Sequence, residues 1–358
     1  MENSNYFEKI LRNPEEGIVN FNLVYIQDHQ LAIKRLKQKD GFSYLIKNKR
    51  LSKKKELERI KKLVIPPAWS KVRICKINNG HLQAVGRDLK NRKQYRYHPL
   101  WNKLRNQTKF YKMVAFGKQL PKIRAKVDSD LELDGWPKNK VLALIIRLME
   151  ETHIRIGNEQ YAKRNKTYGL STLRTRHVKL YKDKIKFEFI GKKGKQHSIT
   201  LRNKRLIRLV NRCEEIPGWE LFQYYDQDGV KHSVDSSLVN EYLHSVSGEL
   251  FSAKDFRTWA ASTIAFEKLM DLGITENSKQ KHKNILSAFD AAASGLGNTR
   301  NVCRKYYVHP AIIASYEDGS IQKNFNMTDM HETSSEYFTE LENAMLHLLN
   351  GYTPEFLQ

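Results

Sequence analysis

The residues best suited to chemistry in this sequence are basic, and they fall into four short clusters. The clusters combine arginine or lysine with aromatic or amide side chains, and they occupy residues 86–99, 153–176, 254–259 and 296–310. Arginine and lysine can hold phosphates or a guanine edge, glutamine can pair with an adenine edge, and tyrosine can stack or donate to phosphate. These residue types indicate a nucleic-acid ligand. For the first cluster, a solvated strand with extended lysines is an equally good explanation.

Other catalytic signatures are absent from the sequence. It contains no P-loop, no Rossmann glycine fingerprint, no HExxH, no EF-hand loop and no GxSxG. The only glycine cluster, Gly295-Leu296-Gly297, lacks the third glycine and the preceding strand that a nucleotide site requires. The sequence also lacks a cluster of metal ligands. We therefore expect chemistry by basic side chains and a nucleophile, with no cofactor; a divalent metal can stimulate turnover but is not required.

Arg155 and the tyrosine pair 306–307 each allow two interpretations. Arg155 directly follows an apolar run at 141–149, so a helix there can deliver it into a cavity, but pairing with Glu150 or Glu151 explains its spacing more simply. The two tyrosines follow an Arg-Lys pair, and neighbouring cations favour the phenolate form of tyrosine. A tyrosine is nevertheless most often a core or interface residue.

The charge of the chain is large and uneven. Lysine and arginine number 63 against 39 acidic residues, which gives a net charge of +24. Residues 316–358 contain eight acidic residues and one basic residue, so with −7 in this segment residues 1–315 carry +31. A field of that sign favours nucleic acid as the partner. The alternative is a protein whose lysines only maintain solubility.

Composition excludes several protein classes. No apolar run approaches the roughly 18 residues of a membrane span, and the N-terminus lacks the basic and apolar regions of a secretory signal. The three cysteines, Cys75, Cys213 and Cys303, form no CxxC pair. Scarce, unpaired cysteines are typical of a reducing compartment. We therefore expect a cytoplasmic protein with no membrane contact.

Periodicity predicts an α+β fold with a small β-rich N-terminal domain, residues 1–102, and a larger, mainly helical domain, residues 103–358. In the first domain we expect short strands at 18–21 and 23–26, a helix at 51–62, and a hairpin of 72–77 with 81–85 around Asn78-Asn79-Gly80. The second domain is predicted to contain helices and a small β-hairpin, at the following positions. The helices lie at 137–149, 250–272, 281–293 and 335–349, the last with a capping box of Thr333 and Glu336, and the hairpin joins 185–190 to 198–201 through a turn at 191–194.

Five segments, taken in order, resemble the type IB DNA topoisomerases in their compact bacterial and viral form. They are IPPAW at 65–69, GHLQAVGRDLKNRKQYRYHP at 80–99, IRIGNEQYAKRNKTYGLSTLRTRHV at 154–178, KDFRTWAAS at 254–262 and LGNTRNVCRKYYVHP at 296–310. The resemblance extends from about residue 41 to 310. The first and last segments have the spelling of the bacterial branch.

The resemblance implies a site and a reaction. By position in the matching segments, Tyr307 is the nucleophile, Arg155 and Arg257 are the catalytic arginines, and Lys192 is the general acid. Asn298 stands where poxvirus and animal enzymes have histidine, so it offers a neutral donor. Such an enzyme relaxes supercoiled DNA through a 3′-phosphotyrosyl intermediate, strand rotation and religation, without ATP.

The resemblance also implies a partner and leaves two alternatives. The partner is double-stranded DNA, held by a monomeric clamp and located wherever the DNA lies, for example in a bacterial nucleoid. The residues that would contact it are Arg92, Lys93, Gln94, Tyr95, Tyr97 and Tyr161. Tyrosine recombinases share this catalytic set and fold, but they have histidine at the position of Lys254. A non-catalytic basic nucleic-acid-binding protein would explain the charge but not the ordered catalytic set.

Overall fold

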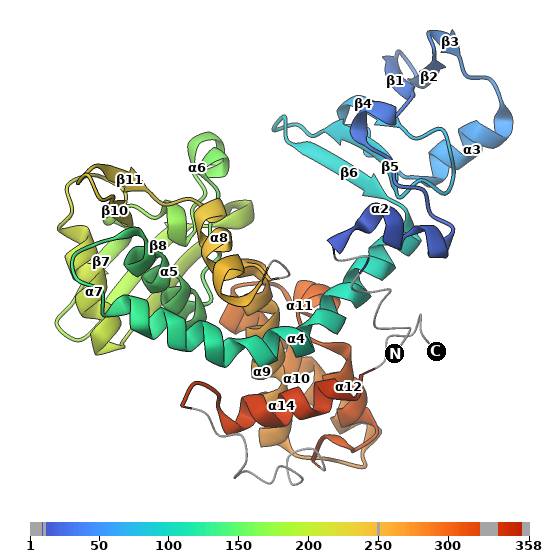
Figure 1. Ribbon diagram of the computed structural model, residues 1–358. Helices are drawn as coiled ribbons and strands as arrows, with labels where there is room; N and C mark the ends of the chain where they lie inside the picture. Colours follow the sequence, from blue (N-terminus) through green and yellow to red (C-terminus); the bar gives the residue numbers. More distant parts are fainter. Residues whose placement is uncertain (1–8, 10–11, 249–250, 323–335, 353–358) are drawn as a thin grey trace. The chain divides into compact units, whose positions relative to one another are not determined.

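The chain divides into two compact units within one long helix, α4 (Pro99–Leu131). The first unit ends at Tyr111 and the second begins at Lys112. The computed structural model describes residues 9, 12–248, 251–322 and 336–352 (Figure 1). The boundary predicted from the sequence, between residues 102 and 103, falls near the beginning of this helix.

A six-stranded antiparallel sheet is the framework of the first unit, with the strand order β3-β2-β1-β4-β5-β6. The strands are β1 (Ile33–Gln38), β2 (Gly41–Ile46), β3 (Lys49–Arg50), β4 (Ser70–Ile74), β5 (Leu82–Arg87) and β6 (Lys93–Tyr97). The predicted hairpin is the β4–β5 pair. The buried side-chain amide of Gln83 closes its loop by donating to the carbonyl oxygens of Asn78 at 2.9 Å and Gly80 at 2.7 Å.

Helix α3 (Lys54–Lys62) packs on this sheet through Ile60, which is its one buried residue. Ile60 joins Ile33, Ile74 and neighbouring strand residues in an apolar cluster, while the lysines of α3 remain exposed. This division of apolar and charged faces is the pattern of an amphipathic surface helix. The helix predicted at 51–62 is therefore confirmed, with its first turn three residues later.

The strands predicted at 18–21 and 23–26 are not formed. Residues 18–21 follow α2 (Pro14–Gly17) and contain the 3₁₀ turn η1 (Val19–Phe21), whereas residues 23–26 form only a single parallel bridge, Val24 with Gly80, before the 3₁₀ turn η2 (Asp28–Gln30). Asn22 adopts a left-handed conformation with φ 53°, which interrupts an extended run. Ile18 and Leu23 then pack together in a cluster with Trp101 and Leu104 of α4. Residues 18–23 thus form a turn that buries Ile18 and Leu23, while Val19 remains 65% exposed.

The second unit is mainly helical and contains two small sheets. Its helices after α4 are α5 (Lys138–Thr152), α6 (Glu159–Asn165), α7 (Lys204–Glu214), α8 (Ser236–Ser247), α9 (Ala253–Leu272), α10 (Ser278–Leu296), α11 (Arg300–Tyr306), α12 (Pro310–Glu317) and α14 (Glu340–Asn350). Its 3₁₀ turns are η3 (Leu170–Thr172), η4 (Thr175–His177) and η5 (Lys192–Gly194). Its strands are β7 (Val178–Leu180), β8 (Ile185–Ile190), β9 (Gln196–Leu201), β10 (Gln223–Tyr225) and β11 (Lys231–Ser233). Strands β7, β8 and β9 form one antiparallel sheet, and β10 and β11 form the other.

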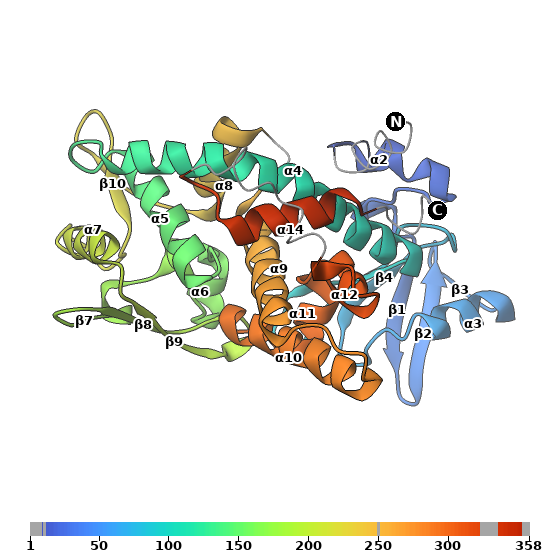
Figure 2. The same ribbon diagram turned by 90° about the horizontal axis from the view of Figure 1, so that it is seen from below.

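Helix α9 lies at the centre of the second unit, where it packs against α5, α8, α10, α12 and α14 (Figure 2). More than half of its residues are buried, and they surround the helix rather than forming a single stripe. A helix that is buried on most sides belongs to the interior of a protein. The buried polar side chains of α9 are therefore surrounded by the helices that pack against it.

The C-terminal acidic segment contributes a buried carboxylate to this interior. Helix α14 is capped by the side chains of Thr339 and Glu342, whereas Thr333 of the predicted capping box lies outside the described residues. Glu342 accepts hydrogen bonds from Arg124 at 2.8 Å and from the Trp259 indole N–H at 2.8 Å. The arginine charge holds the pKa of this carboxyl below its usual range despite its burial.

The predicted α+β class is confirmed: a sheet-based unit is followed by a mainly helical unit with a small hairpin sheet. The helices predicted at 137–149, 250–272, 281–293 and 335–349 correspond to α5, α9, α10 and α14. The predicted hairpin is β8 with β9. Within the described residues, no helix has both the length and the apolar character that a bilayer crossing demands.

Candidate active site

Arg155 is fixed by a tight turn that follows helix α5. His153 ends this helix in a left-handed conformation with φ 53°. The Arg155 carbonyl then accepts a hydrogen bond from the Leu170 N–H at 2.8 Å. A Cβ atom on Gly169 would lie 2.4 Å from the same carbonyl oxygen, so glycine is needed for the two backbones to approach this closely. Arg155 therefore projects from a rigid support.

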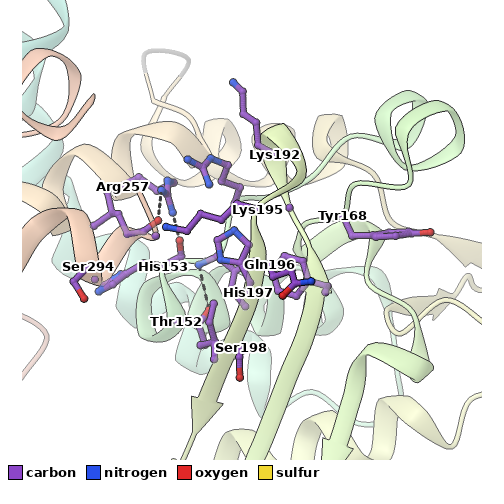
Figure 3. Close-up of a pocket in the computed structure, with 18 residues that line it drawn as sticks. Thr152, His153, Tyr168, Lys192, Lys195, Gln196, His197, Ser198, Arg257 and Ser294 are labelled. Atoms are coloured by element: carbon purple, nitrogen blue, oxygen red, sulfur yellow. Dashed lines mark hydrogen bonds between the residues drawn. The ribbon is translucent and has the colours of Figure 1, made fainter. Parts of the chain in front are cut away.

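Arg257 lies in the first turns of α9 and is only 4% exposed. Its guanidinium donates to the His153 carbonyl, and to the Leu296 carbonyl at 2.9 Å. Burial and the nearby charge of Arg155 lower the pKa of Arg257 to about 10, so it remains charged at neutral pH. Figure 3 shows Arg257 and His153 among the residues that line a cavity, with their hydrogen bond as a dashed line.

Neither of these arginines forms an ion pair with a carboxylate in the part of the chain that the structure describes. Arg155 donates to an amide oxygen, and Arg257 donates to two backbone carbonyls and to the Tyr307 side chain. Buried charges are normally paired or hydrogen-bonded, because removing them from water is costly. Two close, unneutralised guanidinium groups therefore create a site that favours an anion.

Asn298 and Tyr307 lie next to the two arginines. Gly297 ends α10 in a left-handed conformation, and the Asn298 amide oxygen accepts a hydrogen bond from Arg155 at 2.5 Å. Tyr307 follows α11, with the Arg257 guanidinium carbon 5.6 Å from the centre of its ring. Tyr307 is partly buried, whereas its neighbour Tyr306 is 42% exposed. The structure therefore brings together four residues that the sequence predicted.

The turn between β8 and β9 supplies the predicted lysine and a second one. Lys192 and Lys195 both line the cavity, whereas Lys193 does not. In Figure 3 the Lys195 side chain lies across the cavity on the Arg257 side, and the Lys192 side chain extends out of it. Lys192 is exposed, but the partial loss of water that it experiences beside the cavity, followed by the charge of Arg155, lowers its pKa. A lower pKa makes an ammonium group a better proton donor.

The cavity has a volume of about 200 Å³ and includes a histidine that the sequence did not single out. The His197 ring stacks on Phe189, with the ring centres 5.0 Å apart. Burial and the charge of Arg155 lower the pKa of His197 to about 4, so the ring is neutral at physiological pH. His197 is one polar residue on an alternating strand, and no spacing in the sequence distinguishes it from its neighbours.

The residues predicted to contact DNA lie elsewhere than this cavity. Lys93, Gln94, Tyr95 and Tyr97 are on the edge strand β6 of the first unit, directly after Arg92. Tyr95 is 42% exposed and stacks on Tyr97, with the ring centres 5.7 Å apart. Beside this stack, the Lys93 ammonium group lies 5.4 Å from the centre of the Tyr95 ring.

Two aspartates anchor the basic residues of this strand. Asp88 accepts from the Arg92 guanidinium at 2.7 Å and from the Gln94 amide at 3.0 Å, and Lys93 forms an ion pair with Asp28. Tyr161, the last of the predicted contact residues, lies on α6 in the second unit. It is 49% exposed and does not line the cavity.

Comparisons with known proteins agree with this arrangement. The sequence-family model of the eukaryotic DNA topoisomerase I catalytic core matches residues 92–334 of this chain. The family model of the bacterial DNA topoisomerase IB N-terminal domain matches residues 41–88. DNA topoisomerase 1B of Acanthamoeba polyphaga mimivirus is 32% identical over 347 residues, 93% of this chain and 99% of that protein. DNA topoisomerase 1B of vaccinia virus (strain Copenhagen) is 23% identical over 243 residues, 67% of this chain and 73% of that protein.

The first of these models covers both arginines, the lysine turn, Asn298 and Tyr307, and the second covers most of the sheet of the first unit. The mimivirus protein matches the chain across both units. A tyrosine recombinase is not favoured by any of these matches. The chain belongs to the type IB DNA topoisomerases, a family of isomerases that act on DNA.

Proposed function

We propose that this topoisomerase cleaves one strand of duplex DNA with the phenolic oxygen of Tyr307. The phenol gives up its proton as its oxygen forms a bond to the phosphorus of the 3′ phosphate, the bond from that phosphorus to the 5′ oxygen breaks, and the 5′ oxygen takes up a proton and leaves as a hydroxyl. One phosphoester replaces another, so the reaction needs no ATP. The broken strand rotates about the intact strand, and the 5′ hydroxyl then attacks the phosphotyrosine to restore the DNA.

The observation that carries this proposal is the meeting of two unneutralised arginines beside a tyrosine. Arg257 is 5.6 Å from the Tyr307 ring centre, and Arg155 and Arg257 have no carboxylate partner among the described residues. Attack on a phosphodiester concentrates negative charge on the non-bridging oxygens in the transition state. Guanidinium groups fixed in advance stabilise that charge through strong, charge-assisted hydrogen bonds.

Asn298 and Lys192 complete the proposed set. Asn298 holds Arg155 through its amide oxygen and can turn a neutral N–H donor toward the phosphate. Lys192 lines the cavity, and its lowered pKa supports a role as the acid that protonates the leaving 5′ oxygen. Without such a proton the leaving group would be an alkoxide, which is a poor leaving group.

Relaxation of a supercoiled plasmid tests the reaction class directly. The purified protein should relax the plasmid without ATP and without a partner site, and detergent should trap a covalent protein–DNA adduct. Recombination that requires two paired sites would instead support strand exchange. Binding with neither relaxation nor adduct would contradict an enzymatic function.

We expect cleavage to be independent of metal ions, because the two arginines supply the charge that a bound cation would otherwise provide. Single-turnover cleavage in excess chelator should proceed at the rate measured with Mg²⁺. Within the described residues, no three His, Cys, Asp or Glu side chains gather as a metal site. Loss of cleavage in chelator, with recovery on adding Mg²⁺, would overturn this prediction. Faster multiple turnover with Mg²⁺ would not, because divalent ions also speed release from DNA.

We also propose that β6 and α6 contact the duplex and that a single chain closes around the DNA, in the cytoplasm or wherever that DNA lies. The exposed side chains of Lys93, Tyr95 and Tyr161 support the contact. The residues concerned are Arg92, Lys93, Gln94, Tyr95, Tyr97 and Tyr161. A chain that carries +24 would approach DNA without a second subunit.

Replacing Lys93 with alanine should reduce the salt dependence of DNA binding. Each phosphate contact releases counterions and contributes about 0.9 to the slope of log K against log salt concentration. The alanine variant should therefore lose roughly one unit of slope, whereas Lys93→Arg should keep it because the charge remains. Binding measured by fluorescence anisotropy over a range of salt concentrations gives these slopes. An unchanged slope for Lys93→Ala would place this residue away from the phosphates.

A further inference from the structure

Helix α9 holds the backbone around Tyr307 as well as supplying Arg257. Ser262, which is fully buried on this helix, has a hydroxyl that donates to the Tyr307 carbonyl oxygen at 3.2 Å. The same hydroxyl accepts the backbone N–H of His309 at 3.0 Å. A single side chain thus uses both its donor and its acceptor on the segment that carries the proposed nucleophile.

The other side of this segment is attached to helix α11. The N–H groups of Tyr307 and Val308 both donate to the Cys303 carbonyl, at 2.9 Å and 3.0 Å. Val308 and His309 are buried at 2% and 0% exposure, so the segment cannot obtain replacement hydrogen bonds from water. The backbone of Tyr307 is therefore fixed from two helices, and Ser262 is the link to α9.

Ser262 and Arg257 are five residues apart on one helix, and both reach Tyr307. The arginine lies over the phenol ring and the serine bonds the backbone of the same residue. A helix is a rigid spacer with a rise of about 1.5 Å per residue. It follows that the position of the ring relative to the guanidinium depends on the Ser262 bond.

We propose that Ser262 is a positioning residue, which keeps the Tyr307 oxygen in line for attack on the phosphate bound by Arg257. This inference rests on the proposed role of Tyr307 as the nucleophile. Ser262 donates no proton to the reaction and touches no substrate atom in this account. Its effect is on the geometry of attack, and a displacement of about 1 Å in a reacting group can slow a reaction about 100-fold.

Single-turnover cleavage by Ser262→Ala should be slower by about 10- to 100-fold, while the affinity for uncleaved DNA stays within about twofold of the parent protein because the cationic contacts remain. The matched control is Thr263→Ala. Thr263 is the next residue on α9, and its hydroxyl donates within the helix to the Trp259 carbonyl at 3.1 Å. That variant should lose a helix hydrogen bond and keep the parent cleavage rate. Equal cleavage rates for the two alanine variants would overturn the proposal.

Ser262→Cys separates the hydrogen bonds from the volume of the side chain. A thiol fills nearly the same space but is a weak donor and a weak acceptor. Cleavage should therefore remain slow in the cysteine variant. If Ser262→Ala does not fold, Ser262→Cys still tests the proposal. Cleavage at the parent rate in Ser262→Cys would show that packing alone is needed, which would also overturn the proposal.

A comparison of cleavage rates on two substrates gives a second measurement, and a general loss of protein stability would not change their ratio. In DNA with sulfur in place of the scissile 5′ bridging oxygen, the leaving group is easier to expel, but the phosphorus must still be attacked in line. Ser262→Ala should be slowed by the same factor on both substrates. Selective recovery on the sulfur substrate would assign Ser262 to proton transfer instead. If Tyr307→Phe still formed the adduct, the proposed nucleophile would be wrong. If Tyr307→Phe formed no adduct but Ser262→Ala cleaved DNA at the parent rate, only the positioning role of Ser262 would be wrong.

Discussion

Tyr307→Phe is expected to bind DNA with unchanged affinity and to form no covalent adduct at all. Phenylalanine keeps the ring that lies beneath Arg257, so the packing of the site is preserved, but the attacking oxygen is gone. Plasmid relaxation should fall to the background level. Denaturing electrophoresis of the protein with end-labelled DNA measures the adduct, and anisotropy measures the binding.

Tyr306 provides the matched control for this experiment. It is adjacent in the sequence, and it is more exposed than Tyr307, with its ring next to Lys305. Tyr306→Phe should therefore cleave DNA close to the parent rate. An adduct formed by Tyr307→Phe and lost in Tyr306→Phe would move the nucleophile by one residue.

Lys192→Ala is expected to show the second large effect, and the effect should depend on the leaving group. A positioned general acid contributes about 10²- to 10⁴-fold, so cleavage of ordinary DNA should slow by that factor. A bridging 5′ sulfur leaves as a thiolate, whose conjugate acid has a pKa near 8.5, and needs little help from a proton donor. The variant should therefore cleave the sulfur substrate nearly as fast as the parent protein does.

Lys195→Ala is the control that the structure selects, because Lys195 lines the same cavity and lies across it. We expect this variant to bind DNA more weakly and to show no selective recovery with sulfur. Arg155→Ala should remain slow on both substrates, because an arginine stabilises charge rather than donating a proton. If the recovery appeared in Lys195→Ala and not in Lys192→Ala, the general acid would be Lys195.

The fold was predictable where periodic patterns coincide with burial. The helices α5, α9 and α10 and the β8–β9 hairpin were all identified from apolar spacing and turn residues. The failure at 18–26 has a local cause. An apolar run of four residues fits a strand or a buried turn equally well, and the left-handed Asn22 with the packing of Ile18 on α4 decides for the turn.

The site was harder to predict because its contacts join distant parts of the chain. Spacing alone favoured a surface pair of Arg155 with Glu150 or Glu151, but Glu150 instead accepts from Arg124 at 2.9 Å, and Arg155 reaches Asn298. The sequence separation of that last pair is 143 residues, which no local pattern records. Ser262 was missed for the same reason, because the Tyr307 carbonyl and the His309 N–H that its hydroxyl bonds are brought near only by folding.

The burial of Glu342 makes the order of synthesis matter for this enzyme. A ribosome produces Arg124 and Trp259 long before it produces the carboxylate that both of them contact. Until residues 336–352 emerge, α9 lacks the helix α14 that packs on it, although α9 already carries Arg257. An unfinished chain thus holds every proposed catalytic residue but lacks the packing of α14 on α9. In a chain that ends before residue 336, Arg257 would lie on a helix without the packing of α14 and without the carboxylate that Arg124 and Trp259 contact.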